Sequence, residues 1–201
     1  MGEAAIINDP LSGGFHTAAQ AARLLQIDNP RRIQGWLAGY KNSGAGAVLN
    51  RDYEPVGNSQ ALSFWDLMEI RFLEHFRKQN VPLQTLRKVA IDARKDMGTK
   101  HPFALSNIRY LTDRKAVFSH TAQEEGDKKT LNLVNNQFEM YEAIETALAK
   151  GVAFAPVTGL AESWKPLEEC PNVVIQPKRS FGRPVMVKSG VPVAANSDVA
   201  S

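Results

Sequence analysis

Two short helical patterns stand close together near the N-terminus, and the break between them leaves little freedom in how they pack. The first pattern follows Thr17, a residue type that favours helix N-caps, and its apolar residues recur at helical spacing. In the second, Asn29 offers a cap, Pro30 suits the first helical position and Gly39 predicts the end. The sequence therefore predicts two helices locked at a fixed angle through Ala19, Leu24, Ile33, Trp36 and Leu37.

The exposed start of the second predicted helix carries long hydrogen-bond donors, Arg31, Arg32 and Gln34. A helix fits the major groove of DNA, where arginine pairs with guanine and glutamine with adenine. Helix starts such as Thr17 and basic loop residues suit phosphate. The predicted DNA-contacting residues are Thr17, Arg31, Arg32, Gln34, Tyr40, Lys41 and Arg51. A structural hairpin with a solvated arginine pair is the alternative.

The charge distribution agrees with a DNA-contacting N-terminus. Residues 15–51 contain five arginines and lysines against one acidic residue, Asp28, whereas the whole chain has a net charge of only +3. Such a local excess attracts phosphate, a membrane surface or an acidic protein.

The rest of the chain predicts an α+β protein. Ser63 caps a strongly apolar helix, Pro82 opens another that Gly98 closes, and the aromatic residues Trp65, Phe72 and Phe76 are interpreted as core. Farther along, the pattern predicts a hairpin over residues 108–122, a helix over 131–150 and short strands within 151–189. The predicted division is a leader 1–14, a DNA-binding domain 15–98, an α+β partner-binding or dimerisation region 102–190 and a tail 191–201.

Several classes of protein are disfavoured. Cys170 has no thiol partner, and the four histidines lack the spacing of metal ligands. The histidines are interpreted as surface or packing residues. No metal site and no cofactor are therefore expected. No constellation of catalytic residues is recognisable, which argues against an enzyme. Without a membrane-length apolar run or a signal peptide, the chain is expected to be cytoplasmic.

The segment FHTAAQAARLLQIDNPRRIQGWLAGY resembles the MerR-type winged helix-turn-helix. In that family the following basic loop, here ending near Arg51 and Tyr53, is the wing. The family then has a long apolar helix, a break and a further helix. In this chain Leu83, Leu86 and Arg87 match the pattern at the start of that further helix. This resemblance covers about residues 15–95 and implies a winged DNA-binding domain.

Nearly the whole chain resembles bacterial VapB-type antitoxins with a MerR-like N-terminal domain. The segments that carry this resemblance are RRIQGWLAGY, ALSFWDLMEIRF, GTKHPF and NVVIQPKRSFGRPVMVKSGVP. The last is similar to the start of a small C-terminal antitoxin module. The resemblance implies an antitoxin that binds operator DNA as a dimer, represses its own operon and neutralises a PIN-domain ribonuclease toxin.

The sequence departs from these families at two places. MerR regulators dimerise through one long helix, whereas the corresponding helix here stops near Gly98, so another dimerisation surface is expected. The C-terminal module is expected to be truncated, because the chain ends at Ser201.

A second basic stretch contains Lys178, Arg179 and Arg183, and no acidic residue occurs between Gln176 and Gly190. The resemblance implies that one of these arginines pairs with the carboxylates that hold metal in the toxin, since the guanidinium fork suits carboxylates. A solvated loop is the alternative interpretation of the stretch. Two rival functions stay open: a MerR-type regulator that senses a small molecule near Trp164 or Phe154, and an interaction module that does not bind DNA.

Overall fold

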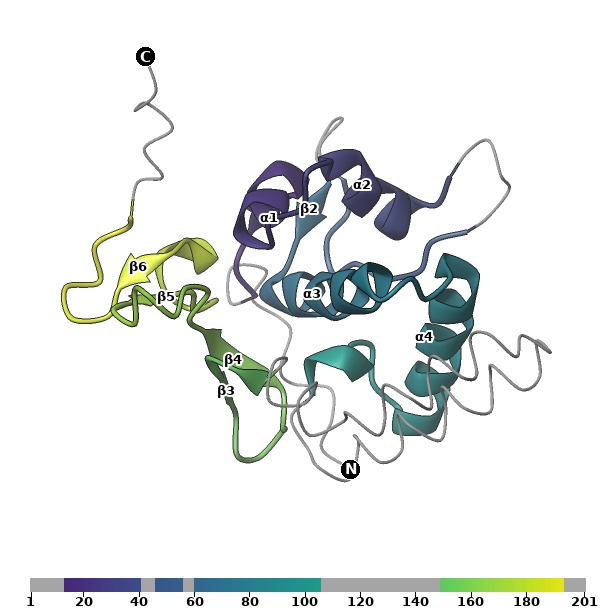
Figure 1. The fold of residues 1–201 in the computed structure, drawn as a ribbon. Helices are drawn as coiled ribbons and strands as arrows, with labels where there is room; N and C mark the ends of the chain where they lie inside the picture. Colours follow the sequence, from purple (N-terminus) through teal and green to yellow (C-terminus); the bar gives the residue numbers. More distant parts are fainter. Residues whose placement is uncertain (1–12, 41–45, 56–59, 106–148, 194–201) are drawn as a thin grey trace, which may run out of the picture.

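The structure is a computed structural model that describes residues 13–40, 46–55, 60–105 and 149–193 (Figure 1). The helices are α1 Ala18–Leu24, α2 Pro30–Ala38, α3 Phe64–Lys78 and α4 Leu83–Met97, with short 3-10 helices η1 Pro102–Ala104 and η2 Ser180–Gly182. The strands are β1 His16–Thr17, β2 Ala61–Leu62, β3 Val152–Phe154, β4 Ala161–Trp164, β5 Val173–Val174 and β6 Val185–Met186. This mixture confirms the expected α+β class. The hairpin predicted over 108–122 and nearly all of the helix predicted over 131–150 lie outside the described residues.

Local capping chemistry sets the ends of α1 and α2. The Thr17 hydroxyl accepts a hydrogen bond from the Gln20 amide at 3.2 Å, and Gln20 Oε1 accepts one from the Thr17 amide at 2.8 Å. Asn29 Oδ1 accepts a hydrogen bond from the Arg31 amide at 3.0 Å, with Pro30 in the first position of α2. Gly39 ends α2 with φ of 80°, a left-handed value that glycine adopts without a steric penalty. The predicted caps and stop are thus confirmed.

The contact between α1 and α2 differs from the expectation at one position. Ile33, Trp36 and Leu37 are buried as predicted, whereas Ala19 is exposed. The buried side of α1 is formed by Ala18, Ala21 and Ala22, whose spacing of three and four residues defines one helix face. Ala19 was predicted wrongly because it lies next to that face in sequence but outside it on the helix.

Helix α3 forms the centre of the core, between the α1–α2 pair and η1 (Figure 1). Ser63 Oγ accepts a hydrogen bond from the Asp66 amide at 3.0 Å, and Asp66 Oδ2 accepts one from the Ser63 amide at 2.8 Å, which completes a capping box. The helix is buried on several sides, as the sequence predicts, and its buried residues include the acidic side chains of Asp66, Glu69 and Glu74. No helix within the described ranges is long and apolar enough to cross a membrane.

Residues 46–49, in the segment between α2 and β2, pack between α2 and α4. The amides of Val48 and Leu49 both donate hydrogen bonds to the Trp36 carbonyl, at 2.8 and 3.1 Å. From α4, Arg94 Nη2 donates to the Val48 carbonyl at 2.8 Å, and Arg87 Nε donates to the Gly46 carbonyl at 3.1 Å. Two helices distant in sequence therefore fix the path of this segment.

The chain beyond α4 stays attached to the helices. In η1, Phe103 stacks on Phe72 of α3 with the ring centroids 4.1 Å apart, and His101 is buried beside the same helix. Residues 101–105 thus belong to the same core as α3 and α4. The domain boundary near 98–102 stays a prediction, since residues 106–148 lie outside the described part of the chain.

The C-terminal strands form antiparallel pairs, β3 with β4 and β5 with β6. All four strands lie within residues 151–189, where the sequence predicts short strands. The Trp65 indole N–H donates to the Ala161 carbonyl at 3.0 Å, and the Arg71 guanidinium lies 5.2 Å from the centre of the Trp164 ring. These contacts fix the β3–β4 pair against α3 and bury Trp164.

Candidate nucleic-acid interface and an adjacent polar cluster

In the first turns of α2, polar side chains face solvent and apolar side chains face the core. Arg31 and Gln34 are exposed, whereas Ile33 and Trp36 are buried against the core. The helix repeat of 3.6 residues produces this alternation, because the two polar residues lie three apart on the face opposite the apolar stripe. Two of the predicted DNA-contacting side chains are thereby placed side by side on an open helix face.

Arg32 lies differently from its neighbour. Its Nη2 atom is 2.9 Å from Glu74 Oε2 on α3, and its guanidinium carbon lies 5.3 Å from the centre of the Trp36 ring. The arginine is half-buried and already paired within the protein. Its side chain therefore extends from α2 to α3, whereas Arg31 is exposed to solvent.

The other predicted contacts border this helix pair. Thr17 lies at the N-terminus of α1 with its hydroxyl engaged in the cap. Tyr40 is exposed just after α2, and its ring packs so closely on Gly35 that a side chain there would collide with it. Arg51 is half-buried, and its Nη1 atom donates to Gln60 Oε1. Lys41 lies outside the described residues.

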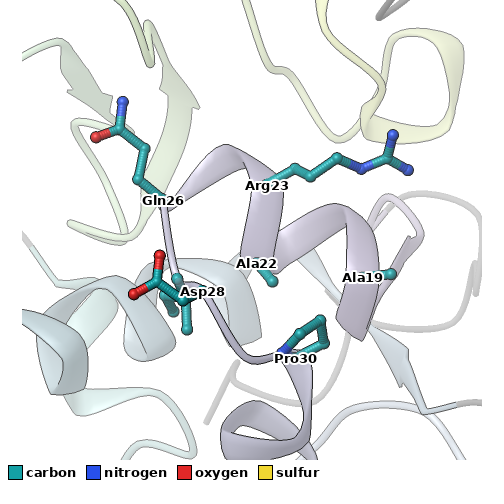
Figure 2. A pocket seen from close by; sticks show the side chains of 7 residues that line it. Ala19, Ala22, Arg23, Gln26, Asp28 and Pro30 are labelled. Carbon is teal, nitrogen blue, oxygen red and sulfur yellow. The ribbon is translucent and has the colours of Figure 1, made fainter. Parts of the chain in front are cut away.

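The outer side of α1 and of the α1–α2 turn forms an open hollow of about 420 Å³ (Figure 2). It is lined by Ala19, Ala22, Arg23, Gln26, Ile27, Asp28 and Pro30. In Figure 2 the long side chains of Arg23 and Gln26 extend away from α1, whereas Ala19 lies near the other end of the helix from the turn and is exposed. The helix pair therefore presents a second open surface beside the exposed face of α2.

The second basic stretch lies in a tight loop around η2. Lys178, Arg179 and Arg183 are all exposed. Between the arginines, Ser180 and Phe181 have φ of 47° and 55°, values at which residues other than glycine are strained. The loop is fixed by the Phe15 amide, which donates a hydrogen bond to the Phe181 carbonyl at 2.7 Å. The structure thus places this loop next to the start of α1.

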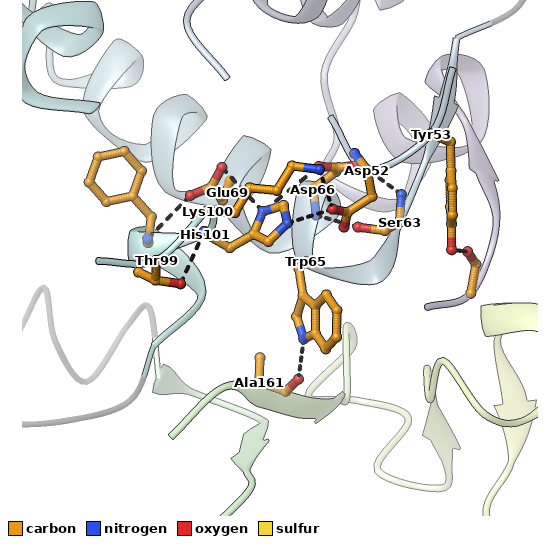
Figure 3. Close-up of polar contacts among 12 residues, drawn as sticks. Asp52, Tyr53, Ser63, Trp65, Asp66, Glu69, Thr99, Lys100, His101 and Ala161 are labelled. Atoms are coloured by element: carbon orange, nitrogen blue, oxygen red, sulfur yellow. Dashed lines mark hydrogen bonds and ion pairs between the residues drawn. The ribbon is translucent and has the colours of Figure 1, made fainter. Parts of the chain in front are cut away.

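A buried polar cluster, formed by Asp52, Asp66, Glu69 and His101 with Lys100 at its exposed edge, lies against α3 (Figure 3). Asp52 Oδ1 accepts from Lys100 Nζ at 2.7 Å and lies 2.9 Å from His101 Nε2. His101 Nδ1 is 3.6 Å from Glu69 Oε2 and 3.9 Å from Asp66 Oδ1. The cluster joins the loop before β2, the helix α3 and the chain that follows α4.

Burial and charge act on the cluster in opposite directions. Burial disfavours a charged His101, but the hydrogen bond with Asp52 and the negative charges of Asp52 and Glu69 outweigh it and raise the pKa of His101 to about 9. Burial also opposes the charge of Asp52, yet His101 and Lys100 hold its pKa well below the usual range. Burial raises the pKa of Asp66 to about 6.

Sequence reasoning did not find this cluster. It treated His101 as an isolated histidine, because the carboxylates that surround it come from Glu69, Asp66 and Asp52, which are 32, 35 and 49 residues away in the sequence. One local sign was available. Asp66 and Glu69 are acidic residues one turn apart on a helix that is otherwise strongly apolar, and buried carboxylates need partners.

No protein-family model matches the chain. It is 29% identical over 196 residues to a Mycobacterium tuberculosis protein named "Putative antitoxin VapB45", and the match covers 90% of this chain and 80% of that protein. The fold is similar to the crystal structure of Rv2018 from Mycobacterium tuberculosis, with a TM-score of 0.66 and 25% identity. That match covers 93% of this chain and 84% of the other. Similarity over most of both sequences supports a VapB-type antitoxin.

Proposed function

We propose that the chain is the antitoxin of a type II toxin–antitoxin pair. In this proposal a MerR-like winged helix-turn-helix, formed by the N-terminal helices, binds operator DNA as a dimer and represses the shared operon. The C-terminal part neutralises a PIN-domain ribonuclease toxin. The proposal rests on the similarity to the protein named as a VapB antitoxin and on the resemblance of the N-terminal segments to MerR-type domains.

The exposed face of α2 is the observation that carries the DNA-binding part. Arg31 and Gln34 lie one turn apart at the N-terminal end of a helix whose other side is fixed in the core. Recognition helices contact bases with their N-terminal residues, so this arrangement suits entry into the major groove. We assign base contacts to Arg31 and Gln34, and we assign Arg32 the role of holding α2 against α3 through Glu74.

Phosphate contacts would come from residues around the helix pair. Thr17 lies at the start of α1, and Tyr40 and Arg51 lie at the two ends of the segment proposed as the wing. Such contacts carry little sequence information but supply salt-dependent affinity. Lys41 completes the set proposed from the sequence.

Binding to the protein's own promoter tests the DNA-binding part. Fluorescence anisotropy at moderate salt should give tighter binding to the promoter duplex than to a scrambled duplex of equal length. The Arg31→Ala/Gln34→Ala variant should lose most of this preference, whereas Lys95→Ala, an exposed lysine on α4, should keep it. Equal affinity of the wild-type protein for both duplexes would contradict the proposal.

The strained η2 loop supports the toxin-binding part. Strain of this kind persists where the surroundings fix it and is common at binding sites. In this loop Arg179 and Arg183, which flank the strained residues in the sequence, are both exposed, and Phe181 between them is 57% exposed. Guanidinium groups held in this way suit the clustered carboxylates of a metal-dependent nuclease.

Purification together with the product of the adjacent gene tests this part. The wild-type protein should form a stable complex with that product and inhibit its ribonuclease activity. Arg179→Glu/Arg183→Glu should weaken inhibition strongly, because it brings carboxylates against carboxylates, while Lys165→Glu should inhibit normally. Full inhibition by the double variant would remove these arginines from the toxin site.

A further inference from the structure

The buried polar cluster leaves several of its atoms without a hydrogen bond. Among the described residues, the buried atoms that lack a partner include Asp52 Oδ2, Asp66 Oδ1, Glu69 Oε2 and His101 Nδ1. Buried polar atoms in proteins nearly always have a partner, and groups of exceptions often mark an ion or a water. Four such atoms in one cluster indicate that something else satisfies them.

The distances argue against a proton alone as the missing partner. A proton on His101 Nδ1 would face Glu69 Oε2 at 3.6 Å and Asp66 Oδ1 at 3.9 Å, and both separations exceed a hydrogen bond. Asp66 is fully buried and His101 is 3% exposed, so bulk water does not reach these atoms freely.

Three of these atoms form a suitable set of metal ligands. Asp66 Oδ1 lies 3.9 Å and Glu69 Oε2 lies 3.6 Å from His101 Nδ1. Ligand bonds of about 2.0–2.2 Å from carboxylate oxygen and imidazole nitrogen to zinc leave ligand atoms separated by distances of this size.

The surroundings of His101 match those of a metal-binding histidine. Its Nε2 atom lies 2.9 Å from Asp52 Oδ1, which leaves Nδ1 as the free nitrogen. Metal-binding histidines commonly donate their second N–H to a carboxylate, which fixes the ring and makes the ligand more basic. Lys100 in turn donates to the same Asp52 oxygen at 2.7 Å and holds that carboxylate in place.

We propose that Asp66 and His101 bind a divalent transition-metal ion through Asp66 Oδ1 and His101 Nδ1, with Glu69 as a further oxygen donor and Asp52 holding the His101 ring through Nε2. The ion would join the start of α3 to the segment that follows α4, and Asp52 would link the loop before β2 to the site. This inference is independent of the proposed function, because it rests on the cluster alone.

Zinc binding by the full chain tests the proposal. The background variant is Cys170→Ser, because Cys170 is an exposed thiol that could bind zinc by itself. After treatment with a chelator and dialysis against Zn²⁺, elemental analysis should find one zinc per chain, and the melting temperature should rise. Cobalt should give the visible absorption of a site with nitrogen and oxygen ligands.

Matched variants locate the ion. Asp66→Asn and His101→Gln should each lower zinc affinity at least about tenfold, whereas His75→Gln, which removes a half-buried histidine outside the cluster, should bind zinc like the background protein. Nitrogen NMR of the background protein provides a test that needs no ligand variant. The Nδ1 resonance of His101 should shift on addition of Zn²⁺.

Two results would overturn the proposal. The first is no stoichiometric zinc in the background protein and no shift of the His101 Nδ1 resonance, which would leave a protonated His101 or a buried water as the partner of the cluster. The second is zinc bound equally well by Asp66→Asn, His101→Gln and His75→Gln, which would place the ion elsewhere in the chain.

Discussion

Arg32 Nη2 lies 2.9 Å from Glu74 Oε2, so the second arginine of α2 is paired with the protein's own core helix. The Glu74 side chain is 6% exposed, whereas that of Arg32 is 38% exposed. Lys78 approaches the same carboxylate only to 4.0 Å, which makes Arg32 the principal partner of a nearly buried charge. Adjacent arginines in the sequence therefore have different roles: one fixes the helix, and the other faces solvent.

The first prediction concerns stability. Arg32→Ala should lower the free energy of unfolding by about 1–3 kcal/mol, because it leaves the Glu74 carboxylate buried without its main partner. Urea denaturation followed by tryptophan fluorescence measures the change. Arg31→Ala is the matched control and should stay within about 0.5 kcal/mol of the wild type, as exposed positions usually do. Equal stability of the two variants would show that the ion pair with Glu74 adds nothing.

The second prediction concerns DNA specificity. Arg31→Ala should reduce discrimination between the operator and a scrambled duplex by about 1–3 kcal/mol, the usual contribution of one arginine–guanine pair. Anisotropy titrations on both duplexes at one salt concentration measure it. A parallel loss of affinity for both duplexes would mean that Arg31 contacts only phosphate. Because Arg31→Ala is expected to remain as stable as the wild type, loss of fold would not explain the result.

Local chemistry made the helix ends predictable. Thr17, Asn29 and Ser63 cap helices in the structure as the sequence predicts, and Gly98 closes α4 with φ of 61°. Each of these signals lies within a few residues of the feature that it determines. The same holds for the apolar stripe of α2, whose spacing alone identifies the buried face.

The polar contacts were not predictable in the same way. Arg32 and Glu74 are 42 residues apart, and Asp52 and His101 are 49 apart. An exposed arginine and a paired arginine look alike in a sequence, since only the packing of α2 on α3 decides which one meets Glu74. The role of Arg32 and the existence of the buried cluster therefore required the tertiary structure.

The third prediction concerns pH. His16 is buried, its Nε2 atom has no hydrogen-bond partner, and burial lowers its pKa from 6.5 to about 4. Between these two values the unfolded chain binds a proton that the folded chain does not, so stability should fall as the pH decreases from about 6.5 to 4. The shift corresponds to at most about 3 kcal/mol.

Urea denaturation at several pH values compares the wild type with His16→Gln. The variant should lose less stability on acidification, and the difference between the two proteins should appear within that pH window. Other groups that titrate there, such as Asp66, are present in both proteins and cancel in the difference. Parallel curves would show that His16 is already protonated or exposed in the folded chain.

The last prediction concerns the attachment of the η2 loop to the N-terminal segment. Gly182 has φ of 79°, and a Cβ atom there would lie 3.0 Å from His16 Nε2 and 3.2 Å from Gly14 Cα. Gly190 has a similar φ of 69° but open space around it. Gly190→Ala should therefore cost only the backbone strain, about 1–2 kcal/mol, whereas Gly182→Ala must also push the loop away from β1.

Hydrogen exchange at the Phe15 amide, which donates to the Phe181 carbonyl at 2.7 Å, reports on this attachment directly. Exchange should accelerate in Gly182→Ala and stay unchanged in Gly190→Ala. Slow exchange in both variants would show that the loop tolerates the extra methyl group. If the loop detaches, Arg179 and Arg183 lose their fixed positions. Toxin inhibition should then weaken in Gly182→Ala although both arginines are still present.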